Sequence, residues 1–243
     1  AENAASLDWI TDGNYVLGVG LGYRPEEFEA LGVEFEQRVS RFEEAIPLIR
    51  RLWNEDSVTH HGKHFKVGGL GASIKPKRAG GPPIWVGGDV IAAVKRAAKL
   101  NCPWIAPPTM TFQEITERVE VYKKTSAEIS GRFVNEQPII REVAIGKTKA
   151  EALRVARPAL LSKYESYASW GQTATKEQVS LSDSFDEFIK DRFIIGDESE
   201  VADEVARYKD SFGEGEFLVR IQWPGFAQSN VLESIERLGK III

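Results

Sequence analysis

The sequence has 243 residues, of which 42% are hydrophobic and 28% are charged, the balance of a globular chain that can bury a sizeable core. Lysine and arginine number 31 against 36 acidic residues, and the resulting net charge of −5 argues against nucleic acid as the main partner. No apolar run approaches the ~20 residues that cross a bilayer, and a single cysteine excludes an internal disulfide framework.

The first half of the chain alternates short apolar runs with amphipathic segments. In chain order it predicts a helix, a strand, a helix, a hairpin, a strand and a helix, at residues 1–10, 15–20, 38–53, 58–66, 84–86 and 89–100. Apolar runs this short are typical of strands buried on both faces, as in parallel sheets. Asn101 is the expected stop of the helix that begins near Asp89.

The second half continues the same rhythm until residue 145. It predicts a strand, a helix and a strand at residues 104–105, 111–130 and 139–145. Residues 148–192 break the pattern and are interpreted as an insertion or lid. A helix that carries Val201 to Phe212, a strand at 217–221 and a last helix that carries Val231 to Ile242 complete the chain.

Repeated strand, loop and helix units imply an α/β fold with a parallel sheet. The two candidate architectures are an open doubly wound sheet and a (β/α)8 barrel. About five strands are evident, fewer than the eight that close a barrel.

The first glycine cluster follows the strand at 15–20. A dinucleotide fingerprint needs glycine at its first, third and sixth positions. Counted from Gly18 the sixth residue is Tyr23, and counted from Gly20 it is Pro25, so the fingerprint is absent. The glycines then either ease the strand into a tight loop or line a phosphate in another way.

The second cluster, Gly87 and Gly88, lies between a buried strand and a helix. Free N–H groups and the helix dipole at such a point attract an anion such as phosphate. Asp89 supports the alternative of a plain N-cap, and its own charge would repel a phosphate.

The three histidines, His60, His61 and His64, cluster in the predicted hairpin. Adjacent strand residues point to opposite faces, so a solvated hairpin is favoured over a metal site. Cys102 has no reactive signature around it and is expected to be a buried structural thiol. No nucleophile elbow, Walker A or HExxH pattern occurs, and no catalytic acid or base is identified.

The last strand ends in Arg220-Ile221-Gln222-Trp223-Pro224-Gly225. In a barrel the carboxyl ends of the strands line the active site, so Gln222 and Trp223 would face a ligand. The alternative is a packed loop in which proline and glycine fix the turn.

Taken together, these segments resemble the bacterial luciferase-like superfamily of flavin-dependent oxidoreductases. The resemblance rests on the order and spacing of segments that cover nearly the whole chain: 7–13, 17–23, 26–28, 31–32, 41–53, 82–88, 96–98 and 220–225. It implies a (β/α)8 barrel that binds FMN or the deazaflavin coenzyme F-420.

Carried over residue by residue, the resemblance implies a cofactor phosphate between the two glycine loops and a flavin beside Gln222 and Trp223. The implied cofactor-binding residues are Gly20, Leu21, Gly22, Tyr23, Val86, Gly87, Gly88 and Asp89. Luciferases proper have arginine where Leu21 stands, so one charge partner of the phosphate is absent.

The same resemblance makes the strand at 15–20 the fourth of the barrel. We therefore expect residues 1–243 to form one luciferase-like barrel domain that lacks its three N-terminal β/α units. The chain would be a fragment, a reduced relative, or a subunit that pairs with another chain to complete the barrel. Exposed sheet edges make a homo-oligomer a further alternative.

The expected function is that of a flavin-dependent oxidoreductase, in first place a cytoplasmic monooxygenase that uses reduced flavin and O2 on a small organic substrate. Three alternatives stay open. They are a non-catalytic flavin- or phosphate-binding remnant, a deazaflavin-dependent hydride-transfer enzyme, and a barrel enzyme that acts on a phosphorylated metabolite.

Overall fold

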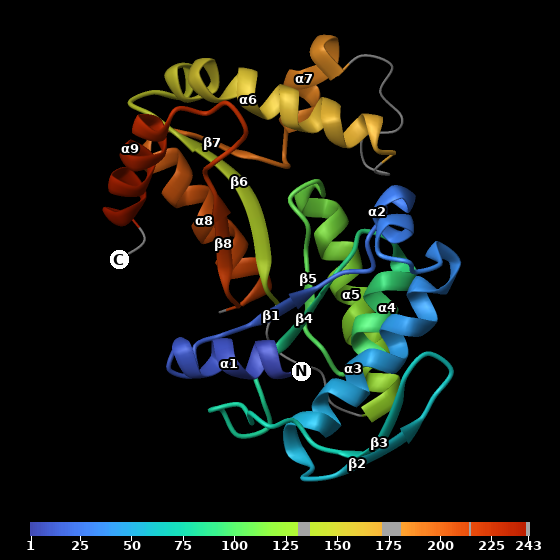
Figure 1. Ribbon diagram of the computed structural model, residues 1–243. Helices are drawn as coiled ribbons and strands as arrows, with labels where there is room; N and C mark the ends of the chain where they lie inside the picture. The colour runs from blue at the N-terminus through green and yellow to red at the C-terminus, as the bar shows by residue number, and fades with distance from the viewer. Residues whose placement is uncertain (131–136, 172–180, 214, 242–243) are drawn as a thin grey trace. The chain divides into compact units, whose positions relative to one another are not determined.

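The computed structural model describes residues 1–130, 137–171, 181–213 and 215–241. The chain divides into two compact units (Figure 1). The first unit holds Ala1–Trp104 and Val121–Val134, and the second holds Ile105–Glu120 and Asn135–Ile243.

The first unit is built on a parallel pair of strands. β1 (Leu17–Val19) pairs in parallel with β4 (Ile84–Gly87), and β5 (Trp104–Ile105) lies on the other side of β4. The first three residues of β4 are buried, as expected for a strand covered on both faces. The helices are α1 (Glu2–Ile10), α2 (Pro25–Ala30), α3 (Arg38–Asn54) and α4 (Ile91–Lys99), with a 3-10 turn at Phe35–Gln37.

Local sequence accounts for the ends of these elements. Pro25 opens α2, where its missing N–H costs nothing. α4 ends before Asn101, whose φ of 50° is the left-handed conformation that asparagine tolerates. The predicted hairpin is confirmed as the antiparallel pair β2 (Val58–His61) and β3 (Lys66–Leu70).

The second unit is built on a three-stranded parallel sheet in the order β7-β6-β8. β6 (Ile139–Ile145) pairs through its first four residues with β8 (Phe217–Arg220) and through its last three with β7 (Ile194–Gly196). α5 (Phe112–Ser130) begins in this unit, which also contains α8 (Glu198–Phe212) and α9 (Gln228–Gly239). Asp197 and Glu200 form a capping box at the start of α8.

The predicted insertion consists of α6 (Lys149–Ser169) and α7 (Leu181–Ile189), which pack on each other and share an aromatic core with the segment after β8. Its polar loop, residues 172–180, lies outside the described residues. Tyr164, Phe188 and Phe193 meet in this core with ring centroids 4.9–5.6 Å apart. Such pairs add to the stabilisation that burial already provides.

The α/β class with parallel strands is confirmed, and all five predicted strands are present. The structure adds β7, a sixth strand in the parallel sheets of the described residues, with only three residues. Within the described residues the named strands form two parallel sheets and do not close into a ring, and a single parallel bridge joins Ala106, directly after β5, to Ile139. That residues 1–243 form one barrel domain stays a prediction. None of the described helices has both the length and the apolarity to cross a membrane.

Candidate functional site

Two glycine-containing loops leave the same edge of the first unit's sheet. In the parallel pair, Val19 lies opposite Val86, so Gly20 and Gly87 are the next residues on neighbouring strands. The loop from Gly20 to Tyr23 and the loop from Gly87 to Asp89 therefore start side by side at the carboxyl end of the sheet. In open α/β sheets this is the edge that binds ligands.

The second loop delivers the free N–H groups of a helix N-terminus. The N-cap of α4 is Val90, which offers no side-chain hydrogen bond, and the first bonds of the helix come from the N–H groups of Ala93 and Val94. The N–H groups of Ile91 and Ala92 precede these and have no acceptor within the helix. Such groups, together with the helix dipole, suit an anion.

Gly88 shapes this loop. Its φ of +151° is rare for residues with side chains, and a Cβ built there would lie 2.5 Å from the Cβ of Ala93. The indole N–H of Trp104 donates to the Gly88 carbonyl at 2.8 Å and fixes the peptide. Asp89 is half-buried but is not the N-cap, so the plain-cap alternative is wrong, and α4 begins two residues later than predicted.

The first loop is also shaped by a glycine. Gly22 has a φ of +78°, and a Cβ there would meet the ring of Phe28 at 2.9 Å. Gly20 is exposed, Leu21 is half-buried and the Tyr23 side chain is 42% exposed. Tyr23 can therefore meet a ligand from solution.

Of the eight predicted cofactor-binding residues, Val86 alone is buried, at 2% exposure within β4. The structure brings all eight to two neighbouring loops or strand ends of one unit. Their role in binding a cofactor stays a prediction.

Gln222 and Trp223 lie in the second unit and differ from each other. Gln222 is exposed, and its amide donates to the Trp223 carbonyl at 3.3 Å. Trp223 is 1% exposed and packs against Phe226 at 4.8 Å between ring centroids. The packed-loop alternative describes Trp223, whereas the ligand-facing role of Gln222 stays a prediction.

A buried polar cluster around Glu142 was missed by the sequence reasoning. The Glu142 carboxylate has no exposure and accepts hydrogen bonds from Lys163 (2.5 Å), Tyr164 (2.8 Å) and the indole of Trp223 (2.6 Å). Arg220, its register partner on β8, forms an ion pair with it at 3.2 Å. We call these five residues the Glu142 cluster.

Burial governs the titration of the cluster. It lowers the pKa of Lys163, a shift that the Glu142 carboxylate opposes. Burial and then the same carboxylate raise the pKa of Tyr164 well above its usual value, so the phenol stays protonated. A signal was present in the sequence, because Arg141 and Glu142 interrupt an otherwise apolar strand.

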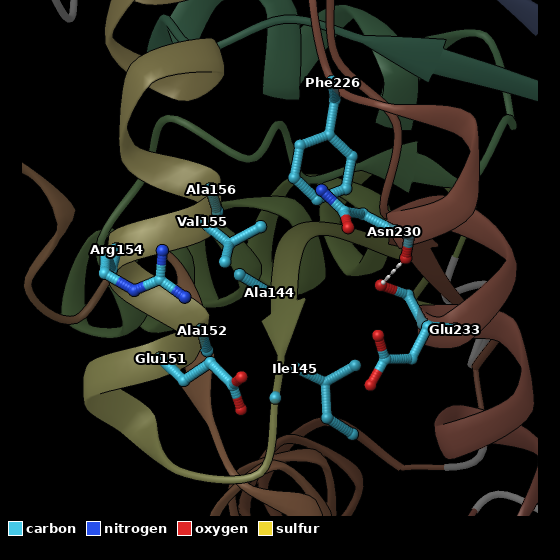
Figure 2. Close-up of a pocket in the computed structure, with 12 residues that line it drawn as sticks. Ala144, Ile145, Glu151, Ala152, Arg154, Val155, Ala156, Phe226, Asn230 and Glu233 are labelled. Carbon is cyan, nitrogen blue, oxygen red and sulfur yellow. Dashed lines mark hydrogen bonds between the residues drawn. The ribbon is translucent and has the colours of Figure 1, made fainter.

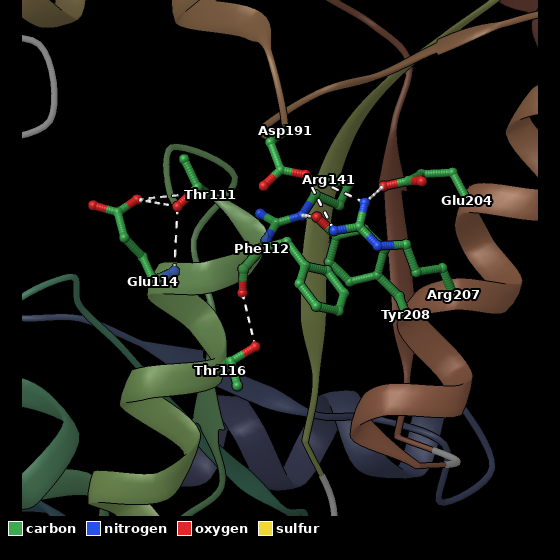
Figure 3. A network of polar contacts seen from close by, with 9 residues as sticks. All are labelled: Thr111, Phe112, Glu114, Thr116, Arg141, Asp191, Glu204, Arg207 and Tyr208. Carbon is green, nitrogen blue, oxygen red and sulfur yellow. Dashed lines mark hydrogen bonds and ion pairs between the residues drawn. The ribbon is translucent and has the colours of Figure 1, made fainter.

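Arg141 is the centre of a second buried network (Figure 3). Its Nε donates to the Tyr208 hydroxyl at 2.9 Å and its Nη1 to the Pro107 carbonyl at 3.0 Å. Burial lowers the pKa of this guanidinium, and the contact with Tyr208 opposes the shift. Arg207 stacks 3.9 Å from the centre of the Phe112 ring nearby. These contacts join β6, α5 and α8.

The second unit also contains a pocket of about 220 Å³ (Figure 2). Its floor is apolar, from Ala144, Ala152 and Ala156, and its rim carries the carboxylates of Glu151 and Glu233. No predicted site residue lines it. Arg154 also lines the pocket and Glu233 is paired with Arg237, so the charges of the lining favour neither an anionic nor a cationic ligand.

A carboxylate, Glu44, contacts two of the three hairpin histidines, His60 and His64. Glu44 accepts from the backbone N–H groups of His64 (3.0 Å) and Phe65 (2.9 Å) and lies 2.9 Å from Nε2 of His60. Burial opposes its ionisation, but these hydrogen bonds outweigh burial and hold the pKa of Glu44 at about 2. The described part of the chain shows no group of three metal-ligating side chains.

Cys102 is fully buried, as predicted. Burial raises the pKa of its thiol, although the guanidinium of Arg50 lies 3.0 Å from the sulfur and opposes the shift. Because burial outweighs the guanidinium, the thiol is not activated as a nucleophile.

Comparisons with known proteins agree with this architecture. A family model described as luciferase-like monooxygenase matches residues 1–215. The phthiodiolone/phenolphthiodiolone dimycocerosates ketoreductase of Mycobacterium kansasii is 31% identical over 134 residues, which are 54% of this chain and 36% of that protein. The FMNH(2)-dependent dimethylsulfone monooxygenase of Pseudomonas fluorescens is 33% identical over 104 residues, which are 42% of this chain and 28% of that protein.

Solved structures share the fold at low identity. The monooxygenase RslO1 from Streptomyces bottropensis superposes with a TM-score of 0.83 at 18% identity, covering 99% of this chain and 71% of that one. The coenzyme F420-dependent tetrahydromethanopterin reductase from Methanopyrus kandleri gives 0.70 at 16% identity, covering 98% and 76%. The matches to the two curated relatives span about a third of their length or less.

Proposed function

Because the chain belongs to the luciferase-like monooxygenase family, we propose that it is a flavin-dependent oxidoreductase. The main proposal is a monooxygenase that binds FMN and acts with O2 on a small organic substrate. The alternative cofactor is the deazaflavin F-420, with hydride transfer as the reaction. Both cofactors carry a phosphate, and the proposal starts from the site that would hold it.

The observation that carries the proposal is the pairing of β1 with β4. It places the loop after Val19 beside the free N–H groups at the start of α4. These donors fit a phosphate ester, and Gly87 and Gly88 allow it to approach without a Cβ in the way. No lysine or arginine occurs at 20–23 or 86–89, so backbone donors would supply the binding.

The chain's own residues would bind and orient the cofactor. The N–H groups of Ile91 and Ala92 would hold the phosphate, the loop of Leu21 and Tyr23 would cover it, and Trp104 would keep the Gly88 peptide in place. The bound flavin supplies the redox chemistry, namely hydride transfer or activation of O2.

Fluorescence titration of the chain tests the proposal with three ligands: FMN, riboflavin, which lacks the phosphate, and F-420. We expect saturable binding of FMN or F-420 in the micromolar range, about −8 kcal/mol. Riboflavin is expected to bind more weakly than FMN. Equal affinity for FMN and riboflavin would show that the loops do not hold the phosphate. A folded chain that binds neither FMN nor F-420 would overturn the proposal.

Asp89→Asn makes the test more specific, because the direction of its effect on FMN affinity can be predicted. The charge of Asp89 repels a phosphate at the same helix end, so its removal should tighten FMN binding about two- to fivefold. Riboflavin affinity should not change. Asp56→Asn, at an exposed position of the same unit, is the matched control and should leave both affinities unchanged.

A turnover assay distinguishes an enzyme from a non-catalytic flavin-binding protein. Reduced FMN bound to the chain should consume O2 faster when a substrate is present than when it is absent. A chain that binds flavin and gives no substrate-dependent reaction across a broad set of small organic compounds would support the binding-protein alternative.

A further inference from the structure

The Glu142 cluster carries more positive than negative charge. One carboxylate, Glu142, faces two cations, Lys163 and Arg220. Tyr164 and Trp223 add neutral hydrogen bonds to the same carboxylate. The cluster therefore has a formal charge of +1 in a part of the second unit where Glu142 and Lys163 are almost fully removed from water. Water screens a charge poorly in such surroundings.

The two cations are not equivalent. The Lys163 side chain is 7% exposed and lies 2.5 Å from Glu142, so the carboxylate neutralises its positive charge. The Arg220 side chain is 32% exposed and touches Glu142 through Nη1 alone, at 3.2 Å. A guanidinium has five N–H donors in a planar fork. Within the described residues no second ion pair of Arg220 is present, so the ion pair with Glu142 leaves other donors of the partly exposed fork for a ligand.

Arg220 also lies at the end of its strand where a ligand is expected to bind. It is the last residue of β8, and parallel strands present ligand-binding groups at their carboxyl ends. The exposed Gln222 follows it two residues later. Trp223, anchored on Glu142 by its indole N–H, keeps the segment after Arg220 in place.

We propose that Arg220, oriented by Glu142, binds an oxyanion carried by the substrate, a carboxylate, sulfonate or phosphate group. The planar fork suits two oxygens of such a group, and the ion pair with Glu142 holds the fork in one orientation. Glu142 is a positioning residue, since it does not touch the ligand. This inference rests on the proposed function, because the ligand is the substrate of that oxidoreductase.

Titration calorimetry at low ionic strength, where charge attraction is least screened, tests the proposal. The probes are benzoate, benzenesulfonate and phenyl phosphate, with benzamide as the uncharged analogue. We expect at least one anion to bind about tenfold or more tighter than benzamide. Arg220→Gln should abolish this preference.

Arg157→Gln is the matched control, since the Arg157 side chain lies in the same unit and is 34% exposed. It should leave the preference unchanged. No preference for any of the three anions, or a preference that survives in Arg220→Gln, would overturn the proposal. If Arg220→Gln does not fold, Arg220→Lys keeps the charge but not the planar fork and should weaken the anion preference, and its full retention would overturn the proposal.

A second experiment shows whether the oxyanion that Arg220 binds belongs to the substrate or to the cofactor. If Arg220 held the cofactor phosphate, Arg220→Gln would weaken FMN but not riboflavin, and the proposal would fail. Unchanged affinity for both ligands supports it. Flavin binding without anion preference would refute this inference alone, whereas anion preference without flavin binding would refute the proposed function alone.

Discussion

Glu142→Gln is predicted to destabilise the second unit strongly. The carboxylate accepts three hydrogen bonds and an ion pair while fully buried. A glutamine has the same shape but only one accepting oxygen, and its NH2 would face donors. At least one donor would lose its acceptor, and the buried charge of Lys163 would lose its partner.

The expected magnitude follows from these contacts. Removing one partner of a buried ion pair costs about 3–5 kcal/mol, because the other charge stays buried without compensation. Arg220 is partly exposed and can turn to water, so we expect the lower part of that range, about 3 kcal/mol. This is a large share of the roughly 5–15 kcal/mol that holds a typical domain folded.

The assay is urea unfolding at neutral pH, followed by far-UV circular dichroism and tryptophan fluorescence. Glu187→Gln is the control, because its carboxylate is 79% exposed and its ion pair with Lys190 spans 3.8 Å. Its effect should stay within about 0.5 kcal/mol. The double variant Glu142→Gln/Lys163→Met should lose less stability than the sum of the two single variants, because it removes both charges.

Two results would refute the reasoning. One is a loss below about 1 kcal/mol in Glu142→Gln, the typical effect of an ordinary substitution. The other is full additivity with Lys163→Met, which would mean that the two charges do not interact.

Three further predictions concern the first unit. Gly88→Ala should lower the free energy of unfolding by about 1–3 kcal/mol, because its Cβ would overlap Ala93; a stability equal to that of the unaltered chain would contradict the contact. Cys102 should react with a thiol reagent far more slowly in the native chain than in urea, since burial raises the pKa of its thiol; equal rates would contradict the burial. Glu44 has a folded pKa of about 2, so its contribution is fully present above the ordinary value of 4.5 and is lost as pH falls from there towards 2. Glu44→Gln should therefore flatten the stability profile in that window, and an unchanged profile would refute the role of its hydrogen bonds.

Local patterns in the sequence were sufficient for most of the secondary structure. The predicted strands of the two parallel sheets are mainly apolar runs, and helices such as α3, α4 and α9 have apolar residues at spacings of three and four. β7 was missed because three residues, Ile194–Gly196, are too few to show a period. The start of α4 was placed two residues early, because Asp89 has the side chain of an N-cap but does not occupy that position.

The two glycine loops could also be predicted from the sequence. Alternating strands and helices imply a parallel sheet, and the carboxyl ends of parallel strands share one edge. The resemblance to the luciferase-like superfamily implied that the loops after 15–20 and 84–86 lie on either side of a phosphate, and the pairing of β1 with β4 brings them to the same edge.

Only the tertiary structure shows which partners surround the buried polar residues of the second unit. Glu142 meets partners 21, 22 and 81 residues away in the sequence, which no local pattern connects. Trp223 shows the same limit, since the sequence allowed it to face a ligand or the core, and the Glu142 carboxylate holds it in the core. Helix and strand patterns depend on neighbours within a few residues, whereas the cost of burying a charge depends on which partners the complete fold brings to it.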